Sequence, residues 1–236
     1  MIILAIDTST PRLGVSLARD GEYLAGGSFD PVGTHMQQIL PVIEVVLRDA
    51  GCTLGQVDAF AASIGPGSFT GIRVGVATMQ ALAAAAGKPC LALNTLEVCA
   101  EDYLAPGEIT VPMLEARNRR IYTAAYREGQ MVLAPVVEGV DEFFGRLAVT
   151  LREQLLTPEA IVLCGDETAA RYAEDEQVRA LFTQKVYAAE TTYYRPEVLG
   201  KLAYRAYQSG RLLEPAELLP EYYAPTQAER NLGVFV

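Results

Sequence analysis

The feature that most constrains the fold is an order of strands and helices that occurs twice along the chain. In the first half, three strands precede a helix, a strand and a second helix, over residues 2–6, 14–18, 22–29, 36–50, 57–65 and 69–86. The second half shows the same order over residues 109–116, 120–127, 131–137, 141–156, 160–164 and 167–182. The pattern predicts two βββαβα units, each a mixed sheet with helices packed against it.

This duplicated α/β order matches the fold shared by actin, sugar kinases and the Hsp70 ATPase domain. That fold is built from two ribonuclease H-like halves. We therefore expect an N-terminal lobe over residues 1–105, a C-terminal lobe over residues 106–236, and a cleft between the two lobes. Four shorter elements complete the expected lobes: a strand over 90–93, a helix over 96–104, a strand over 185–188 and a last helix from Arg195-Pro196 to Gly210.

Pro41 lies inside the first helical stripe. Because proline has no backbone N–H, it cannot donate to the carbonyl of Gln37, and we expect a kink or a later helix start there.

The chain carries a glycine-rich turn, Gly65-Pro66-Gly67-Ser68-Phe69-Thr70-Gly71-Ile72-Arg73-Val74-Gly75, between a strand and a helix. Such a turn can present backbone N–H groups to an anion. Two alternatives stay open: a phosphate or anion site, and an ordinary tight turn followed by a helix that packs on its glycine face. A Walker loop is excluded, because no Lys-Ser or Lys-Thr pair follows the glycines.

A polar segment, Asp7-Thr8-Ser9-Thr10, follows the first strand, at the end where open α/β sheets place ligands. The carboxylate could hold hydrated Mg²⁺ and the hydroxyls phosphate oxygens, or the segment could be an Asx turn that joins two strands. The candidate nucleotide or anion site therefore comprises Asp7, Thr8, Ser9, Gly65, Gly67 and Ser68.

Composition restricts the other function classes. The net charge of −10 disfavours a nucleic-acid binder that acts alone. Cys52, Cys90, Cys99 and Cys164 form no CxxC pair, and His35 is the single histidine, so we predict no cysteine- or histidine-based metal site and a reducing compartment. We also expect no membrane span, because no segment approaches about 20 uncharged apolar residues.

Three segments taken in order resemble one known family. They are Ile3-Leu4-Ala5-Ile6-Asp7-Thr8-Ser9-Thr10, His35 with Leu40-Pro41-Val42-Ile43, and the glycine-rich turn from Gly65 to Gly75. Together they are similar to the TsaB (YeaZ) family, and the resemblance covers nearly the full length. It is weaker in the second half, where Glu115-Ala116-Arg117-Asn118-Arg119-Arg120-Ile121-Tyr122 stands for the usual Asp-Ala-Arg-Arg-Gly-Glu-Val-Tyr, and Pro220-Glu221-Tyr222-Tyr223 for the usual Tyr-Leu-Arg.

The resemblance implies a role and a set of partners. TsaB is a bacterial paralogue of TsaD, the subunit that attaches threonylcarbamoyl to adenosine 37 of tRNAs reading ANN codons. It implies a cytoplasmic scaffold that binds TsaD, the ATPase TsaE and a second copy of itself, and that meets tRNA only through the complex. No cofactor is required; ATP or ADP with Mg at a junction of the complex stays open.

The resemblance also implies that the chain is not the transferase. The catalytic relative has an HxxxH metal motif, whose two positions fall here on Thr95 and Cys99. A threonine and one cysteine replace two imidazoles poorly, so the iron or zinc site of the relative is not expected.

For the partner surface, the resemblance points to the helix that begins near Phe69. We expect the dimer and TsaD to share Phe69, Gly71, Gly75, Met79, Leu82 and His35, and Gly75→Arg to abolish TsaD binding in a folded monomer. His35 could also simply cap its helix. The Arg117, Arg119 and Arg120 cluster is either a solvated turn or a partner or anion contact. The alternative function is an ATPase or kinase of the actin-like fold, with Gly165-Asp166-Glu167 as a second phosphate turn.

Overall fold

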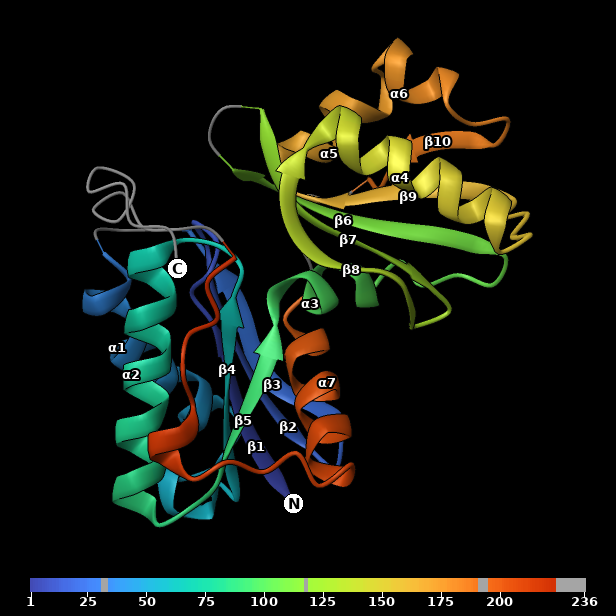
Figure 1. The fold of residues 1–236 in the computed structure, drawn as a ribbon. Helices are drawn as coiled ribbons and strands as arrows, with labels where there is room; N and C mark the ends of the chain where they lie inside the picture. Colours follow the sequence, from blue (N-terminus) through green and yellow to red (C-terminus); the bar gives the residue numbers. More distant parts are fainter. Residues whose placement is uncertain (31–33, 117–118, 191–194, 224–236) are drawn as a thin grey trace. The chain divides into compact units, whose positions relative to one another are not determined.

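The chain forms two compact units, shown by a computed structural model that describes residues 1–30, 34–116, 119–190 and 195–223 (Figure 1). One unit joins Met1–Val98 to the segment from Arg195 onward, and the other spans Cys99–Tyr194. Among the described residues each unit has a five-stranded mixed sheet. The strand order is the same in both, with the first strand of each unit between its second and fourth. The duplicated α/β fold is thereby confirmed.

The first sheet has the order β3-β2-β1-β4-β5. Its strands are β1 (Ile2–Asp7), β2 (Leu13–Arg19), β3 (Glu22–Phe29), β4 (Ala59–Gly65) and β5 (Cys90–Asn94). β1 runs antiparallel to β2 and parallel to β4, and β4 runs parallel to β5. The carboxyl ends of β1, β4 and β5 therefore meet at one edge, which brings the Asp7 and Gly65 segments together.

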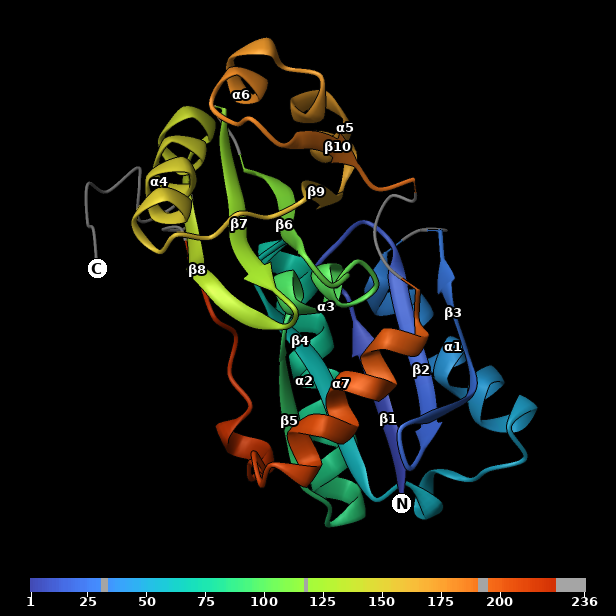
Figure 2. The ribbon, with the colours of Figure 1, turned by 90° about the vertical axis from the view of Figure 1, so that its right-hand side faces the viewer.

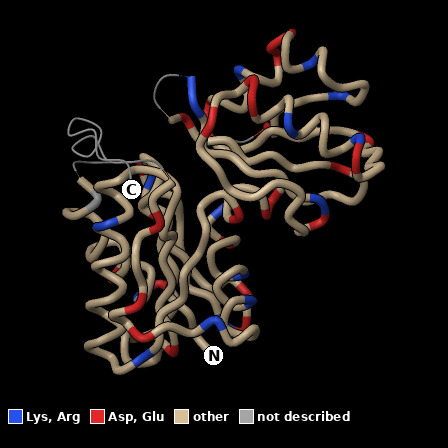
Figure 3. Tube along the Cα trace, in the orientation of Figure 1, with Lys and Arg blue, Asp and Glu red and all other residues tan. Residues whose placement is uncertain are grey.

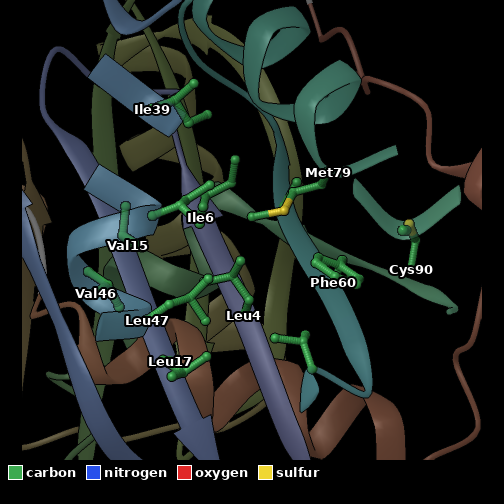
Figure 4. Packing of buried hydrophobic residues seen from close by; sticks show 14 of the residues in the cluster. Leu4, Ile6, Val15, Leu17, Ile39, Val46, Leu47, Phe60, Met79 and Cys90 are labelled. Carbon is green, nitrogen blue, oxygen red and sulfur yellow. The ribbon is translucent and has the colours of Figure 1, made fainter. Parts of the chain in front are cut away.

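Helices α1 (His35–Asp49) and α2 (Phe69–Ala86) cover one face of this sheet (Figure 1). The hydrophobic core lies beneath them, where side chains of β1 and β2 point toward both helices (Figure 4). The cluster includes Leu4, Ile6, Val15, Leu17, Ile39, Val46, Leu47, Phe60, Ile72 and Met79. The Ser68 hydroxyl caps the start of α2, and Gly87 ends it in the left-handed conformation that glycine adopts without strain.

Of the two outcomes expected at Pro41, a kink or a later helix start, the later start is wrong, because α1 begins at His35 and continues through Pro41. Gln37 and Pro41 are both exposed. Water can therefore hydrate the Gln37 carbonyl that loses its helical partner, which lowers the cost of a proline inside the helix.

The last helix, α7 (Glu197–Gln208), contacts β1, β2, β3 and β5 (Figure 2). It lies on the face opposite α1 and α2. A Cβ atom on Gly200 would lie 2.6 Å from the Ala18 Cβ, so glycine allows this close approach. The expected boundary near residue 106 placed this helix with the second half of the chain. In the structure it covers the first sheet instead, whose small residues Ala5 and Ala61 are fully buried.

The second unit begins within α3 (Thr95–Glu101) and has the sheet order β10-β9-β6-β7-β8. Its strands are β6 (Glu108–Ala116), β7 (Arg120–Arg127), β8 (Gln130–Gly139), β9 (Ala160–Gly165) and β10 (Lys185–Ala188). Its helices are α4 (Val140–Glu153), α5 (Glu167–Ala173) and α6 (Glu176–Ala180). The helical region expected over 167–182 consists of two helices, because the Asp175 side chain caps a new start.

Charge is mixed over each unit, with Lys and Arg interspersed among Asp and Glu (Figure 3). The four cysteines are buried and form no disulfide. Within the described ranges α2 is the one helix long and apolar enough to cross a membrane. Its residues Gly71, Ile72, Gly75 and Met79 are buried and the helix packs on β4, which is typical of a core helix.

Candidate functional site at the start of helix α2

The polar segment after β1 is buried, and hydrogen bonds form between its own residues. Asp7, Thr8, Ser9 and Thr10 are all less than 5% exposed. Asp7 Oδ1 accepts hydrogen bonds from the Ser9 backbone N–H at 2.7 Å and from the Ser9 hydroxyl at 2.5 Å. This is the Asx-turn geometry, one of the two alternatives that the sequence left open.

The turn between β4 and α2 lies directly beside this segment. Gly65 and Gly67 have φ values of +128° and +151°, which side chains rarely adopt. The Ser68 backbone N–H donates to the Ser9 carbonyl at 2.7 Å, and the Ser68 hydroxyl accepts from the Gly71 N–H at 3.2 Å. Two N–H groups of the turn are thus occupied by the chain itself.

The glycines of this turn and of α2 face oxygen atoms. A Cβ on Gly67 would lie 2.3 Å from the Ser9 carbonyl oxygen, and one on Gly71 would lie 2.0 Å from the Thr8 carbonyl oxygen. At Gly75 it would lie 2.2 Å from Thr8 Oγ1. The Thr8 hydroxyl in turn donates to the Gly71 carbonyl at 2.7 Å. Because these neighbours are mainly acceptors, an anion placed in the glycine spaces would meet negative partial charge.

Three residues expected at a partner surface therefore lie inside the first unit. Gly71 and Gly75 are buried against Thr8, and Met79 is a fully buried member of the core. The glycine spacing clears room for the Thr8 turn rather than for a second protein. From this geometry we now expect Gly75→Arg to disrupt the fold itself, in place of the folded monomer expected from the sequence.

The other expected partner residues have different positions. Phe69 and Leu82 are half-buried on α2. His35 is the first residue of α1, and its side chain lies outside the described part of the structure. Leu82 faces α1 across a groove of 740 Å³, called here the α1–α2 groove. The groove is lined by Leu40, Pro41, Ile43, Glu44, Leu47, Arg48, Cys52, Thr53, Leu54 and Leu82.

The chain after α7 returns to α2 and contacts Phe69. The Tyr222 ring lies on the Phe69 ring with centroids 4.8 Å apart, and Arg73 Nε donates to the Tyr222 hydroxyl at 2.7 Å. The Tyr223 hydroxyl accepts from the Asn94 side chain at 3.0 Å. Burial, together with the nearby Glu221, raises the pKa of Tyr223. In the sequence, Tyr222 and Tyr223 appear only as a departure from the usual Tyr-Leu-Arg of the family, with no signal that they return to the glycine turn.

The two positions of the relative's metal motif lie one turn apart on α3. Thr95 and Cys99 are both fully buried. No group of three or more His, Cys, Asp or Glu side chains that could hold a metal occurs among the described residues. A threonine hydroxyl and one thiol do not fit the two-imidazole site of the catalytic relative.

The proposed second phosphate turn, Gly165-Asp166-Glu167, is also filled by groups of the chain itself. Gly165 has a φ of +116°, and a Cβ there would lie 2.2 Å from the Met113 carbonyl oxygen. The Asp166 carboxylate accepts from the backbone N–H groups of Thr168 at 2.8 Å and Glu115 at 2.7 Å, so it caps α5. Arg119 and Arg120 are exposed at the β6–β7 connection, and Arg117 lies outside the described residues.

Fold and site together define the class: a duplicated α/β chain of the actin-like type. Its likeness to the ethanolamine utilization protein EutJ of Carboxydothermus hydrogenoformans, with a TM-score of 0.50 and 13% identity, concerns the fold alone. The structure titled "YeaZ from Pseudomonas aeruginosa" is more similar, with a TM-score of 0.72 and 27% identity. That likeness covers 94% of this chain and 100% of the other.

Sequence comparisons narrow the class to a family. The model described as "TsaD: tRNA N6-adenosine threonylcarbamoyltransferase" matches residues 32–209. The tRNA threonylcarbamoyladenosine biosynthesis protein TsaB of Haemophilus influenzae is 34% identical over 188 residues, which are 78% of this chain and 77% of that protein. TsaB of Escherichia coli is 36% identical over 132 residues, 55% of this chain and 57% of that protein. The chain belongs to the TsaB family of tRNA threonylcarbamoyladenosine biosynthesis proteins.

Proposed function

We propose that this chain is a non-catalytic subunit that acts with TsaD and TsaE in transfer of threonylcarbamoyl to adenosine 37 of tRNAs reading ANN codons. The chain belongs to a family named for tRNA threonylcarbamoyladenosine biosynthesis, and this membership supports a role in that modification. The proposal includes a cytoplasmic location, a homodimer in the absence of TsaD, and contact with tRNA only through the complex. The last point agrees with the net charge of −10 and with the Lys and Arg positions of the described residues, which are interspersed among Asp and Glu in Figure 3.

The observation that carries the non-catalytic role is the pair Thr95 and Cys99. Both are fully buried on α3. The family resemblance places the two histidines of the catalytic relative at these positions. Neither side chain offers the neutral imidazole nitrogen that iron or zinc binds there. At these two positions the chain therefore lacks the imidazole ligands that would position the transferred group, and we assign catalysis to TsaD.

The partner surface that the structure favours is the α1–α2 groove. Leu40, which lines the groove, is 55% exposed, and Met36, one turn earlier on α1, is 71% exposed. Large apolar side chains gathered on one helix beside an apolar groove are typical of protein–protein contact. This surface replaces the buried Gly71, Gly75 and Met79 in the proposal and retains Leu82. Phe69 and His35, which do not line the groove, stay in the proposal as partner residues at the starts of α2 and α1.

One experiment tests both parts of the proposal. Purified TsaD, TsaE, tRNA and threonylcarbamoyl-adenylate would be assayed with and without this chain, and the chain would be assayed alone. We expect modification only when the chain and TsaD are both present. Modification that proceeds equally without the chain would overturn the proposed role.

A matched pair of variants tests the surface. Leu40→Asp places a charge in the α1–α2 groove and should weaken TsaD binding at least tenfold, because the charge must be desolvated. Leu155→Asp changes an 86% exposed leucine of the second unit and should leave the affinity unchanged. Equal affinities of the two variants in a calorimetric titration would contradict the assignment of the groove.

The second candidate function is an ATPase or kinase that binds Mg-nucleotide through Asp7, Thr8, Ser9, Gly65, Gly67 and Ser68. The position of these residues beside the carboxyl ends of β1 and β4 favours it. The oxygen atoms that face Gly67 and Gly71 disfavour it. We expect no ATP turnover by the chain alone, and titration of MgATP into the chain and into its complex with TsaD would separate autonomous from shared nucleotide binding.

A further inference from the structure

The segment after α7 contacts the first unit through two consecutive parts, which differ in how deeply they are buried. Its first part, Leu213–Leu218, is called here the anchor. Cys90 and Leu213 exchange two backbone hydrogen bonds, at 2.8 and 3.0 Å. Leu218 is fully buried in the core, and its carbonyl accepts from the Gln80 side chain at 2.9 Å. The anchor is thus an integral part of the unit, and its course along α2 is visible in Figure 1.

The part that follows, Leu219–Tyr223, is called here the latch. Leu219 is 61% exposed and Tyr222 is 42% exposed. One backbone hydrogen bond, from the Glu221 N–H to the Ile64 carbonyl at 2.8 Å, is recorded between the latch and the strand β4. The remaining contacts described above come from the two tyrosine side chains. The latch therefore has fewer buried apolar groups than the anchor, which is the condition for local opening.

The latch covers the start of α2. Its Glu221 carbonyl oxygen lies 2.4 Å from the position of a Cβ on Gly65, so the turn accepts the latch only because residue 65 is glycine. Tyr222 lies on the Phe69 ring, and the Arg73 guanidinium lies 3.7 Å above that ring. The closed latch thereby covers the Phe69 ring and engages the Arg73 guanidinium at this end of α2.

We propose that the latch is a displaceable autoinhibitory strap, which a protein partner must open to reach Phe69 and Arg73. This inference rests on the proposed function, because it takes TsaD as the partner at α1 and α2. The free chain holds the latch closed, and binding shifts the equilibrium by as much as the partner prefers the open form. Opening frees an arginine and an aromatic ring, two side-chain types enriched at binding hot spots.

Two variants of Tyr222 test the strap in the full chain. Tyr222→Ala removes the stack and the hydrogen bond to Arg73, and Tyr222→Phe removes the hydrogen bond alone. We expect TsaD affinity to rise about fivefold for Tyr222→Ala and by less for Tyr222→Phe. A lower affinity of Tyr222→Ala would overturn the inference, because Tyr222 would then be part of the interface, and so would an unchanged affinity.

Hydrogen–deuterium exchange gives an independent readout in the free chain. In Tyr222→Ala the Glu221 amide should exchange about tenfold faster than in the unaltered chain, while the Leu213 amide of the anchor should be unchanged. In the complex with TsaD the Glu221 amide should likewise exchange faster. Slower exchange there would overturn the strap.

The same data distinguish the two hypotheses. If neither the unaltered chain nor the variants bind TsaD, the proposed function fails. In that case the inference is judged only by hydrogen–deuterium exchange in the free chain. Equal exchange rates of the Glu221 amide in the unaltered chain and in Tyr222→Ala overturn the inference. The tenfold difference supports a latch that opens for another partner.

Discussion

At the scale of single residues, the same few atoms explain both the glycine-rich motif and its buried position. Thr8 presents its carbonyl oxygen to Gly71 and its hydroxyl to Gly75. A side chain at either position would occupy the same space as those oxygens. The motif therefore allows the segment after β1 to pack against the turn after β4. Its glycines are required because these two segments approach each other closely.

Gly75→Ala should destabilise the protein by about 1–3 kcal/mol, because its Cβ would lie 2.2 Å from Thr8 Oγ1 and α2 would have to shift. Urea unfolding monitored by circular dichroism measures the change. Gly145→Ala is the matched control: it lies inside α4 with no atom within 4 Å of the added Cβ, and should stabilise by about 0.5–1 kcal/mol. Equal effects of the two changes would contradict the steric account.

Cys90 makes the stability depend on pH. Burial, and secondarily Glu214, raise the pKa of this thiol from 9.0 to about 11. The unfolded chain therefore releases this proton at a lower pH than the folded chain. The contribution of Cys90 is fully present below pH 9 and is lost as the pH rises toward 11.

Cys90→Ala should accordingly make the fall in unfolding free energy between pH 9 and 11 shallower than in the unaltered chain. Urea titrations at several pH values in a reducing buffer provide the comparison. The same slope in both proteins would show that this thiol does not titrate as described.

At the scale of elements, periodicity predicts most helices and strands well, because each has one apolar face or a continuous apolar run. The expected helix over 69–86 is observed at those residues, with Ser68 and Gly87 as its caps. The elements that were missed lack such a pattern. The anchor buries a single leucine and pairs through backbone atoms, and neither feature has a sequence period.

Leu218 and Leu219 form an adjacent pair that tests the anchor. Leu218→Ala should cost about 2–5 kcal/mol, because it removes a fully buried side chain from the core beside α2. Leu219→Ala changes a 61% exposed leucine and should alter stability by no more than about 0.5 kcal/mol. Denaturant midpoints give both values. A similar small effect at both positions would mean that the anchor does not support the core.

At the scale of the whole molecule, the chain leaves its first unit and later returns to it. The first sheet is complete by Asn94, but one of its faces is covered by α7, which begins at Glu197. The second unit is inserted between these two parts and is continuous in sequence. The first unit therefore depends on a segment about a hundred residues away from its last strand.

A chain that ends at residue 194 should fail to fold its first unit, because it lacks α7 and the anchor. A fragment spanning Cys99–Tyr194 should unfold cooperatively, since its core of β-sheet and α4 residues is contained within it. Limited proteolysis and thermal melts of the two proteins measure this. Protease resistance of residues 1–98 in the shortened chain would contradict the dependence on α7.

The sequence by itself determined the duplicated strand and helix order, the buried strands, the bounds of α2 and the family resemblance. These depend on local periodicity and on short contiguous motifs. Tertiary structure alone decided which face of α2 points inward, where α7 packs, and that Tyr222 returns to Phe69. An apolar or glycine face looks the same in sequence whether it meets its own chain or a partner, because burial depends on contacts between residues distant along the chain.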